Sequence, residues 1–382
     1  MTITARFIEP LDVLFLRGNQ LFGEPGSYGE ALMPPWPSVA AGALRSRILA
    51  DEGVDLAAFA AGQITHPQLG SPTQPGSFVL QAFQVARRMD DKVELLLPLP
   101  ADLVIEAQGP ENNQVQRITT LRPTALHAGI ATSSPLALVP VLSQPERSKA
   151  ASGWWLLQSG WQSYLNGQTP KAHDLIHSSK LWRFDERVGV GLDEATRSAA
   201  DGKLFTTRAI ALCEGVGFVA TVAGADVPER GGLRFGGDGR AASLHRAAIA
   251  WPQPDFAALA HAKRCRIVLT SPGIFADGWR LPGMQSDNRL TLPGLTARVV
   301  AAAVSRADTV SGWDLAARAP KAAQKTAAAG SVYWLDELAA TPQALGKLAE
   351  QAATLGGLIL GLLGLRLRRG FLLVLTGLRQ QH

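Results

Sequence analysis

The chain has 382 residues, of which 46% are hydrophobic and 18% charged, and its formal net charge is +5. This composition excludes a disordered, highly charged polymer, and the length allows two ordinary hydrophobic cores. The two cysteines, Cys213 and Cys265, are too few for a disulfide framework or a zinc site of four thiolates, so we expect a reducing, cytoplasmic setting. The first residues show no basic segment followed by an apolar one, so we expect no secretory signal.

Positive charge is concentrated in the second half of the chain. Residues 1–150 carry 11 basic and 14 acidic side chains, whereas residues 151–382 carry 26 basic and 18 acidic ones. A basic surface favours a polyanion such as nucleic acid, because Lys and Arg neutralise phosphates and release counterions. An ordinary solvated surface is the alternative, since a modest net charge is common.

The first predicted elements are two strands and a helix. Apolar and polar residues alternate over 3–10, which predicts a strand, and the segment DVLFLR at 12–17 predicts a second strand. A helix is predicted over 39–50, after a proline-rich approach, with Ser38 as its N-cap and Leu44 on its apolar stripe.

An antiparallel hairpin follows, because two strand-like runs at 77–88 and 92–100 flank the turn at 89–91. Strand, helix and antiparallel hairpin in this order are typical of a ferredoxin-like α+β domain. The next segment is rich in Pro, Ser, Asn and Gly, so we place an insertion around 108–180, at the boundary between two domains.

The second half again reads as strands with few helices. Strands are predicted over 204–212, 217–224, 232–237, 242–250, 264–273 and 330–335, the first two being joined by the turn CEGV. A last helix is predicted from Thr341, its N-cap, to the stop signal at Gly356 and Gly357. We therefore predict two α+β domains with antiparallel sheets and inserted loops, at residues 1–150 and 151–382, the second with a basic surface.

The final residues form two apolar runs separated by Arg366, Arg368 and Arg369. Neither run reaches the roughly 18 residues that a membrane span needs. We expect a buried pair of strands or helices with a basic turn between them, and no membrane partner.

One motif is reminiscent of a metal site. In HDLIH, a helix would place His173 and His177 on one face, with Asp174 between them, as in zinc proteases. Those enzymes use Glu at this place, and no third ligand is evident downstream. We therefore expect exposed or partner-facing histidines, no metal and no cofactor.

Nucleophilic catalysis has no clear candidate, because no G-x-S-x-G elbow is present and neither cysteine has a histidine partner at a family spacing. A nuclease would use His66, His127 or His245 as a general base on an RNA hydroxyl. Lone histidines are more often structural, so we expect no catalytic residue.

The stretch GGLRFGGDGR at 231–240 is the most suggestive one, although it matches neither a P-loop nor a dinucleotide loop. A loop here, between two strands, would present backbone N–H groups to a phosphate, with charge from Arg234 and Arg240 and with Asp238 bracing the turn. The alternative is a wide hairpin turn that needs glycines for positive φ.

Several segments together resemble a known family. They are DVLFLRGNQLFG, MPPWPSVAAGALRSRIL, VGVGLDEATRSAADGKLFTTRAIAL, LRFGGDGRAA, GWDL and KAAQKTAAAGSVYW. In this order they resemble the third subunit of the Cmr module of type III-B CRISPR effector complexes, a member of the RAMP superfamily. The likeness runs from residue 1 to about residue 335.

The resemblance implies two ferredoxin-like, RRM-like domains and a non-catalytic role. Such a subunit holds the 5′ handle of the CRISPR RNA and sits against the large polymerase/cyclase-like subunit and the backbone RAMP subunits. A single-stranded handle is recognised through splayed bases, phosphates and sugar hydroxyls.

Roles are carried over only where the local motif matches. The RNA-contact set that we expect comprises Arg45, Arg47, Lys203, Arg208, Arg234, Gly236, Gly237, Gly239 and Arg240. Lys321 and Lys325 lie in an alanine-rich stretch that we expect to be a mobile loop. The family commonly closes on Gly-Phe-Gly, whereas this chain has Leu372 at the last position, so we assign no RNA contact to its C-terminus.

The sequence therefore supports a non-catalytic RNA-binding and assembly subunit. The alternatives are an endoribonuclease that processes repeat RNA, because relatives of this fold do so, and a purely structural subunit.

Overall fold

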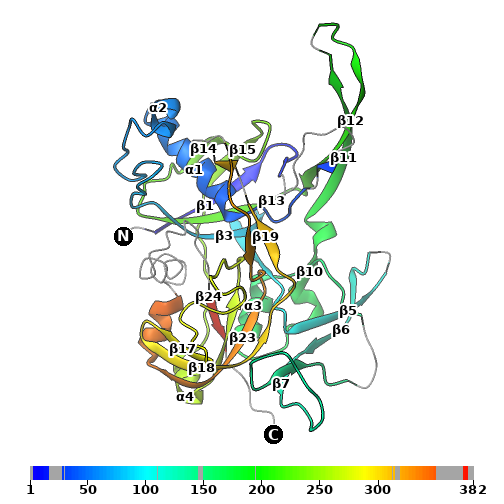
Figure 1. The fold of residues 1–382 in the computed structure, drawn as a ribbon, viewed down its shortest axis with the longest axis vertical. Helices are drawn as coiled ribbons and strands as arrows, with labels where there is room; N and C mark the ends of the chain where they lie inside the picture. The colour runs from blue at the N-terminus through cyan, green and yellow to red at the C-terminus, as the bar shows by residue number, and fades with distance from the viewer. Residues whose placement is uncertain are drawn as a thin grey trace. The chain divides into compact units, whose positions relative to one another are not determined.

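The computed structural model describes residues 3–16, 28–29, 31–109, 111–144, 149–193, 195–311, 313–314, 319–349 and 373–376. Their fold is mixed, with mostly antiparallel strands and few helices (Figure 1), in agreement with the predicted α+β class. Two compact units are distinguished by their internal contacts. Unit 1 comprises Met1–Val93, Lys180–Ala248 and Thr309–Gln324, and unit 2 comprises Glu94–Ser179, Ile249–Asp308 and Lys325–His382.

The two units interleave along the chain, which differs from the consecutive domains 1–150 and 151–382 that the sequence predicted. The reason is the position of the first strand, β1 (Ile3–Pro10). It lies between β13 (Val216–Ala223) and β15 (Ala241–Arg246) and is antiparallel to both. Because β1 lies in the middle of the sheet of unit 1, the start of the chain pairs with strands far along the sequence.

The sheet of unit 1 holds β14 (Arg230–Arg234), β15, β1, β13 and β3 (Val79–Met89), side by side in this order. β4 (Lys92–Pro98) follows β3 after a tight turn and is its neighbour, which confirms the predicted hairpin. Strand β13 is buried along its whole length. Its Gly217 allows close packing, because a Cβ there would lie 2.4 Å from the carbonyl oxygen of Ile8.

Helix α1 (Pro37–Asp51) follows β1 and contacts β3 and β14. Leu44 and Ile48 are buried on its inner stripe, as predicted. Ser38 is not the N-cap: Trp36 takes that position without a side-chain bond, and Pro37 opens the helix. Proline suits this place because the first turn leaves its N–H groups unused. The short helix α2 (Leu56–Ala60) comes next, capped by the carboxylate of Asp55.

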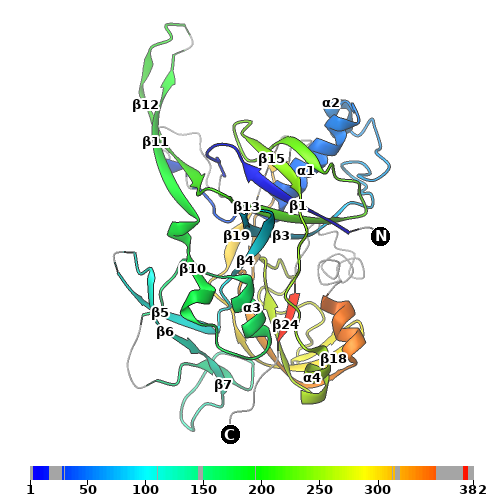
Figure 2. The same cartoon turned by 180° about the vertical axis from the view of Figure 1, so that it is seen from behind.

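Strands β11 (Trp182–Leu192) and β12 (Ala199–Leu212) form a long antiparallel ribbon that projects from unit 1 (Figures 1 and 2). The two-residue strand β2 (Tyr28–Gly29) pairs in parallel with β12. The predicted strand over 204–212 and the turn CEGV are confirmed, since the Val216 N–H donates to the Cys213 carbonyl oxygen at 3.0 Å, but the two strands that the turn joins do not pair. β13 is flanked by β1 and β3 and so has no free edge for β12.

The second strand predicted near the N-terminus is also wrong in its described part, residues 12–16. A single isolated bridge joins Leu14 to Ile210 of β12. The Leu14 side chain is fully buried, so its apolar character reflects burial beside the ribbon and not membership of the sheet.

Unit 2 has its own antiparallel sheet, in the order β17, β18, β23, β16, β24. Its strands are β16 (Cys265–Leu269), β17 (Arg289–Leu292), β18 (Leu295–Ala303), β23 (Val332–Ala340) and β24 (Leu373–Thr376). Residues 342–349 are helical, and Thr341 caps them by accepting a hydrogen bond from the Ala344 N–H at 3.1 Å, as predicted. The predicted stop at Gly356 and Gly357 lies outside the described residues, and so does Leu372.

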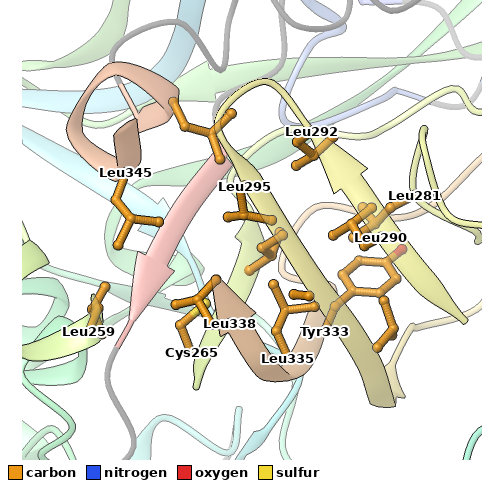
Figure 3. Close-up of a cluster of buried hydrophobic side chains, with 14 of the residues drawn as sticks. Leu259, Cys265, Leu281, Leu290, Leu292, Leu295, Tyr333, Leu335, Leu338 and Leu345 are labelled. Atoms are coloured by element: carbon orange, nitrogen blue, oxygen red, sulfur yellow. The ribbon is translucent and has the colours of Figure 1, made fainter. Parts of the chain in front are cut away.

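The core of unit 2 lies on one face of this sheet (Figure 3). Leu335 and Tyr333 of β23 and Leu290 of β17 pack there with Leu345 of the C-terminal helical segment. Helix α4 (Phe256–Ala262) adds Leu259 to the same cluster.

The segment between β4 and the ribbon is more structured than the predicted insertion. In unit 2 it forms β5 (Leu103–Gln108), β6 (Gln114–Thr120), β7 (Arg122–Thr124), β8 (Val139–Val141), β9 (Trp154–Leu156), α3 (Gln158–Leu165), η1 (Ala172–Asp174) and β10 (Leu175–His177), and η2 (Ser178–Lys180) ends it. Further along the chain lie the short strands β19 (Asp308–Val310), β20 (Trp313–Asp314), β21 (Ala319–Pro320) and β22 (Gln324–Thr326). Apart from β5, β6 and α3, these elements have only two or three residues each, which is too short to give a periodic sequence signal.

A buried polar cluster fixes α3 to the sheet of unit 2. The carboxylate of Asp102 accepts hydrogen bonds from Tyr164 Oη at 2.7 Å and from Arg266 Nη1 at 2.6 Å. The guanidinium of Arg266 also lies 4.4 Å from the Tyr164 ring centre. Burial raises the pKa of Tyr164 well above its usual value. Burial alone would lower the pKa of Arg266, but Tyr164 and Asp102 raise it.

Candidate nucleic-acid interface

The glycine-rich loop at 235–240 closes the hairpin between β14 and β15. Phe235 N–H donates to the Arg240 carbonyl oxygen at 2.8 Å, and Gly236, Asp238 and Gly239 have φ of +86°, +55° and +65°. The hairpin interpretation of the sequence is therefore confirmed, because glycine reaches these backbone conformations without a steric penalty. An RNA contact by this loop stays a prediction.

The loop also packs on the segment that follows β1. Gly237 N–H donates to the carbonyl oxygen of Phe15 at 2.8 Å. A Cβ at Gly236 or at Gly237 would lie 3.1 Å from that same oxygen, which is closer than a side chain comfortably allows. Because glycine has no side chain, the loop can pack closely against the segment that follows β1.

Two arginines meet at the half-buried ring of Phe15. The guanidinium carbon of Arg240 lies 5.0 Å from the ring centre, and that of Arg187, on β11, lies 6.0 Å from it. Each arginine has its own carboxylate, since Arg240 bonds to Asp12 and Arg187 lies 2.8 Å from Asp185. Arg234, the last residue of β14, is exposed and has no carboxylate partner among the described residues.

The two arginines predicted on α1 have structural partners. Arg47 makes a bidentate pair with Asp51, at 2.9 and 2.7 Å, and its Nη1 donates to the carbonyl oxygen of Gly232 on β14. Arg45 lies with its guanidinium 4.8 Å from the ring centre of Phe78. Both side chains are half-buried, and Arg47 ties α1 to the edge strand that leads into the glycine-rich loop.

The two basic residues predicted on the ribbon differ in their surroundings. Lys203 is exposed and makes no ion pair with a described side chain, and its stem covers Gly191 on β11. Arg208 lies 3.6 Å from Glu186 and places its guanidinium 4.3 Å from the ring centre of Phe184. Lys203 thus presents a free charge, whereas the charge of Arg208 is partly matched.

One face of the ribbon is apolar and exposed, a feature that the sequence reasoning missed. Val188 is 69% exposed, Leu192 59%, Leu204 58% and Val190 40%. Val188, Val190 and Leu204 share a face because alternate residues of a strand point to the same side and because Val190 is paired with Leu204, while Leu192 lies beyond an irregularity in the pairing. The alternation of valines and glycines over 188–192 was the available signal.

Lys321 and Lys325 are both exposed. The alanine-rich stretch around them is not wholly a loop, since β21 precedes Lys321 and Lys325 lies within β22. Most of the apolar C-terminal tail lies outside the described residues, apart from β24.

The histidines considered for catalysis are separated in the fold. His66 is buried, and its Nδ1 accepts hydrogen bonds from the N–H groups of Gln68 and Leu69, while Nε2 lies 2.9 Å from Glu52. This pattern fixes a loop. His127 is exposed. His245 lies 3.0 Å from Ser243 Oγ and 3.8 Å from Glu9 Oε2, on a partly exposed part of the sheet.

The helical geometry expected for HDLIH is wrong. Residues 172–174 form a short 3-10 helix and 175–177 a strand, so the two imidazoles do not share a helical face. Asp174 is buried and instead accepts hydrogen bonds from Ser159 Oγ at 2.7 Å and from the Lys171 N–H at 2.9 Å. Its carboxylate secures the start of the turn.

Within the part of the chain that the structure describes, no three His, Cys, Asp or Glu side chains are grouped as metal ligands would be. Burial raises the pKa of Cys265 to about 12, and a thiol in that state is a poor nucleophile. None of the described helices has the length and apolar character that crossing a membrane requires.

Three comparisons with known proteins were made, against solved structures, curated proteins and family profiles. Among solved structures, a chain in the cryo-EM structure of the Type III-B Cmr-beta bound to cognate target RNA has a TM-score of 0.46 and 15% identity, and the match covers 86% of both chains. A chain in a second such structure, with AMPPnP and in state 1, has a TM-score of 0.45 and 15% identity, with 91% of this chain and 89% of that one covered.

A search of curated proteins found no match. The profile of the family described as CRISPR-associated protein (Cas_Cmr3) matches residues 6–365, nearly the whole chain, which confirms the resemblance stated above. This chain therefore belongs to the Cas_Cmr3 family of CRISPR-associated proteins.

Proposed function

We propose that this chain is a non-catalytic RNA-binding subunit of a type III-B CRISPR effector complex. It holds the single-stranded 5′ handle of the CRISPR RNA and docks the large polymerase/cyclase-like subunit and the backbone RAMP subunits. The observation that carries the proposal is the gathering, in a Cas_Cmr3 family member, of the glycine-rich hairpin loop, Arg240 and Arg187 around Phe15 in unit 1.

The strand orders support ferredoxin-like units. In chain order, β1, β3, β13 and β15 are four strands, and the sheet arranges them as fourth, first, third and second, all antiparallel. β16, β18, β23 and β24 repeat this arrangement in unit 2. The split β-α-β pattern gives this order. Each unit has a described helix at one of the two crossovers, α1 in unit 1 and residues 342–349 in unit 2.

Electrostatics supports an RNA partner for unit 1. Arg234 and Lys203 are exposed without a described carboxylate partner, so binding of phosphate would cost them no existing ion pair. Each phosphate that such a side chain neutralises releases a counterion and adds to the affinity. The aliphatic face of the ribbon, the element that also carries Lys203, offers a neighbouring macromolecule an apolar contact surface.

The proposal is tested on the tagged protein purified from its native cell in mild salt. We expect short RNAs with a common 5′ sequence and a large polymerase-like subunit to accompany it. The double variant Arg234→Ala/Arg240→Ala should lose RNA and show a shallower salt dependence, while Arg298→Ala, an exposed arginine of unit 2 paired with Glu337, serves as the control. Unchanged RNA retention by the double variant would contradict a role for this loop, and a protein free of both RNA and subunits would contradict the proposal as a whole.

One observation favours the endoribonuclease alternative. His245 lies beside Ser243 and Glu9, and both His245 and Glu9 are partly exposed, so an imidazole and a carboxylate are close enough to exchange protons with a substrate. Both Ser243 and Glu9 approach Nε2, so the nitrogen that reacts with a substrate would be Nδ1, because an orienting carboxylate binds the nitrogen opposite the reacting one. Cleavage of repeat RNA by the pure protein that His245→Ala abolishes would establish this alternative.

A further inference from the structure

The inference concerns the cluster of Phe15, Arg187 and Arg240, named here the Phe15 cluster. Phe15 is half-buried between β1 and the ribbon, and its carbonyl oxygen is held by the Gly237 N–H. Both guanidiniums lie within the range of a cation–π interaction with its ring, at 5.0 and 6.0 Å. The loop therefore holds the backbone of Phe15, and two guanidiniums lie close to its ring.

The charges of the Phe15 cluster are already matched. Asp12 pairs with Arg240 and Asp185 pairs with Arg187, so the two carboxylates balance the two guanidiniums. A phosphate at either arginine would have to displace or approach a carboxylate, which is unfavourable. Arg234, which has no described carboxylate partner, is the better phosphate ligand in this hairpin.

What the matched arginines still offer is their flat surface. The side chain of Arg240 is 27% exposed and that of Arg187 is 44% exposed. The Arg240 Nε is buried and has no acceptor within the described residues, so the side chain is held by its terminal nitrogen and by the ring. A guanidinium is planar and can stack on flat rings, and here a carboxylate and a phenyl ring limit how far each guanidinium can move.

We infer that the Phe15 cluster is a stacking platform for a nucleobase of single-stranded RNA. Unpaired bases stack on aromatic rings and on guanidinium planes, and such contacts tolerate different bases because each base has a π face. The inference rests on the proposed function and deepens it: within one hairpin, Arg234 binds phosphate and the Phe15 cluster binds a base.

The experiment uses the full-length chain and two labelled probes of equal length, a short single-stranded oligoadenylate and an abasic sugar-phosphate chain. Their phosphates are the same, so the ratio of their dissociation constants isolates the contribution of the bases. We expect the wild type to prefer the oligoadenylate by about tenfold, the effect of one stacked base.

Variants separate stacking from charge. Arg240→Lys keeps the charge but removes the plane, and should abolish the preference for bases while binding of the abasic chain stays unchanged. Arg234→Ala should weaken both probes equally and leave the preference intact. Phe15→Leu removes the aromatic ring but keeps an apolar side chain. Thermal unfolding of this variant, compared with that of the wild type, shows whether a lost preference for bases comes from misfolding.

The outcomes are distinguishable from those of the parent proposal. If the chain binds neither of the two probes, RNA binding by this subunit is contradicted. Binding of both probes with equal affinity, or a preference that survives both Arg240→Lys and Phe15→Leu in folded protein, would overturn the stacking platform alone.

Discussion

In unit 2, the buried carboxylate of Asp102 bonds to two other buried polar side chains. It is completely buried and accepts from Tyr164, on α3, and from Arg266, on β16, so it connects a helix to the sheet. These three buried polar side chains are stable here because Asp102 accepts hydrogen bonds from the other two. Removing one member leaves a charge or a donor buried without a partner.

We expect Asp102→Asn to lower the free energy of unfolding by about 3–5 kcal/mol, because the Arg266 guanidinium loses its counter-charge inside the protein. The control is Glu337→Gln, which breaks an exposed pair with Arg298 in the same unit and should cost less than about 1 kcal/mol. Urea denaturation followed by circular dichroism measures both. Equal effects of the two substitutions would contradict a special role for the buried cluster.

At the scale of elements, the sheet of unit 1 depends on how closely β13 approaches β1. Gly217 has no Cβ, and one built there would lie 2.4 Å from the Ile8 carbonyl oxygen and 2.8 Å from the Phe7 ring. Backbone cannot move aside as a flexible side chain does. The glycine is therefore a packing requirement of the central pair of strands.

Gly217→Ala should destabilise the chain by about 3 kcal/mol, since the extra methyl group must separate two paired strands. Gly232, in the edge strand β14, has nothing within 4 Å of its Cβ position. Gly232→Ala should therefore change the stability by no more than about 0.5 kcal/mol. Thermal unfolding of the two variants compares them directly, and a tolerated Gly217→Ala would show that β1 and β13 separate at little cost.

For the whole molecule, the chain passes repeatedly between its two units. The sheet of unit 1 needs β1 and β3 from the first part of the chain and β13 and β15 from the part after residue 180. A contiguous N-terminal fragment lacks β13, which lies between β1 and β3, and so cannot build this sheet.

We expect a fragment of residues 1–150 to lack cooperative thermal unfolding and dispersed amide resonances. Co-expression with residues 151–382 should restore both, because the complementary fragment supplies β13 and β15. Circular dichroism and nuclear magnetic resonance test this. A folded, cooperatively unfolding fragment 1–150 would favour the consecutive domains that the sequence predicted.

The sequence by itself determined what local patterns encode. The helix at 37–51, the hairpin of β3 and β4, the cap at Thr341 and the glycine turn at 235–240 each rest on neighbours within a few residues. The ordered segments also sufficed for the family. Local propensity and turn chemistry act over short distances, so a linear reading finds them.

Only the tertiary structure decided which strands pair and which charges are free. The partner of Arg240 is Asp12, 228 residues away, and β11, not β13, pairs with β12. In the sequence, Arg47, Arg234 and Arg240 look alike, yet the first anchors a strand, the second is exposed and the third lies on Phe15. Pairing and burial are properties of groups that meet in space, and their energies depend on neighbours that spacing along the chain does not encode.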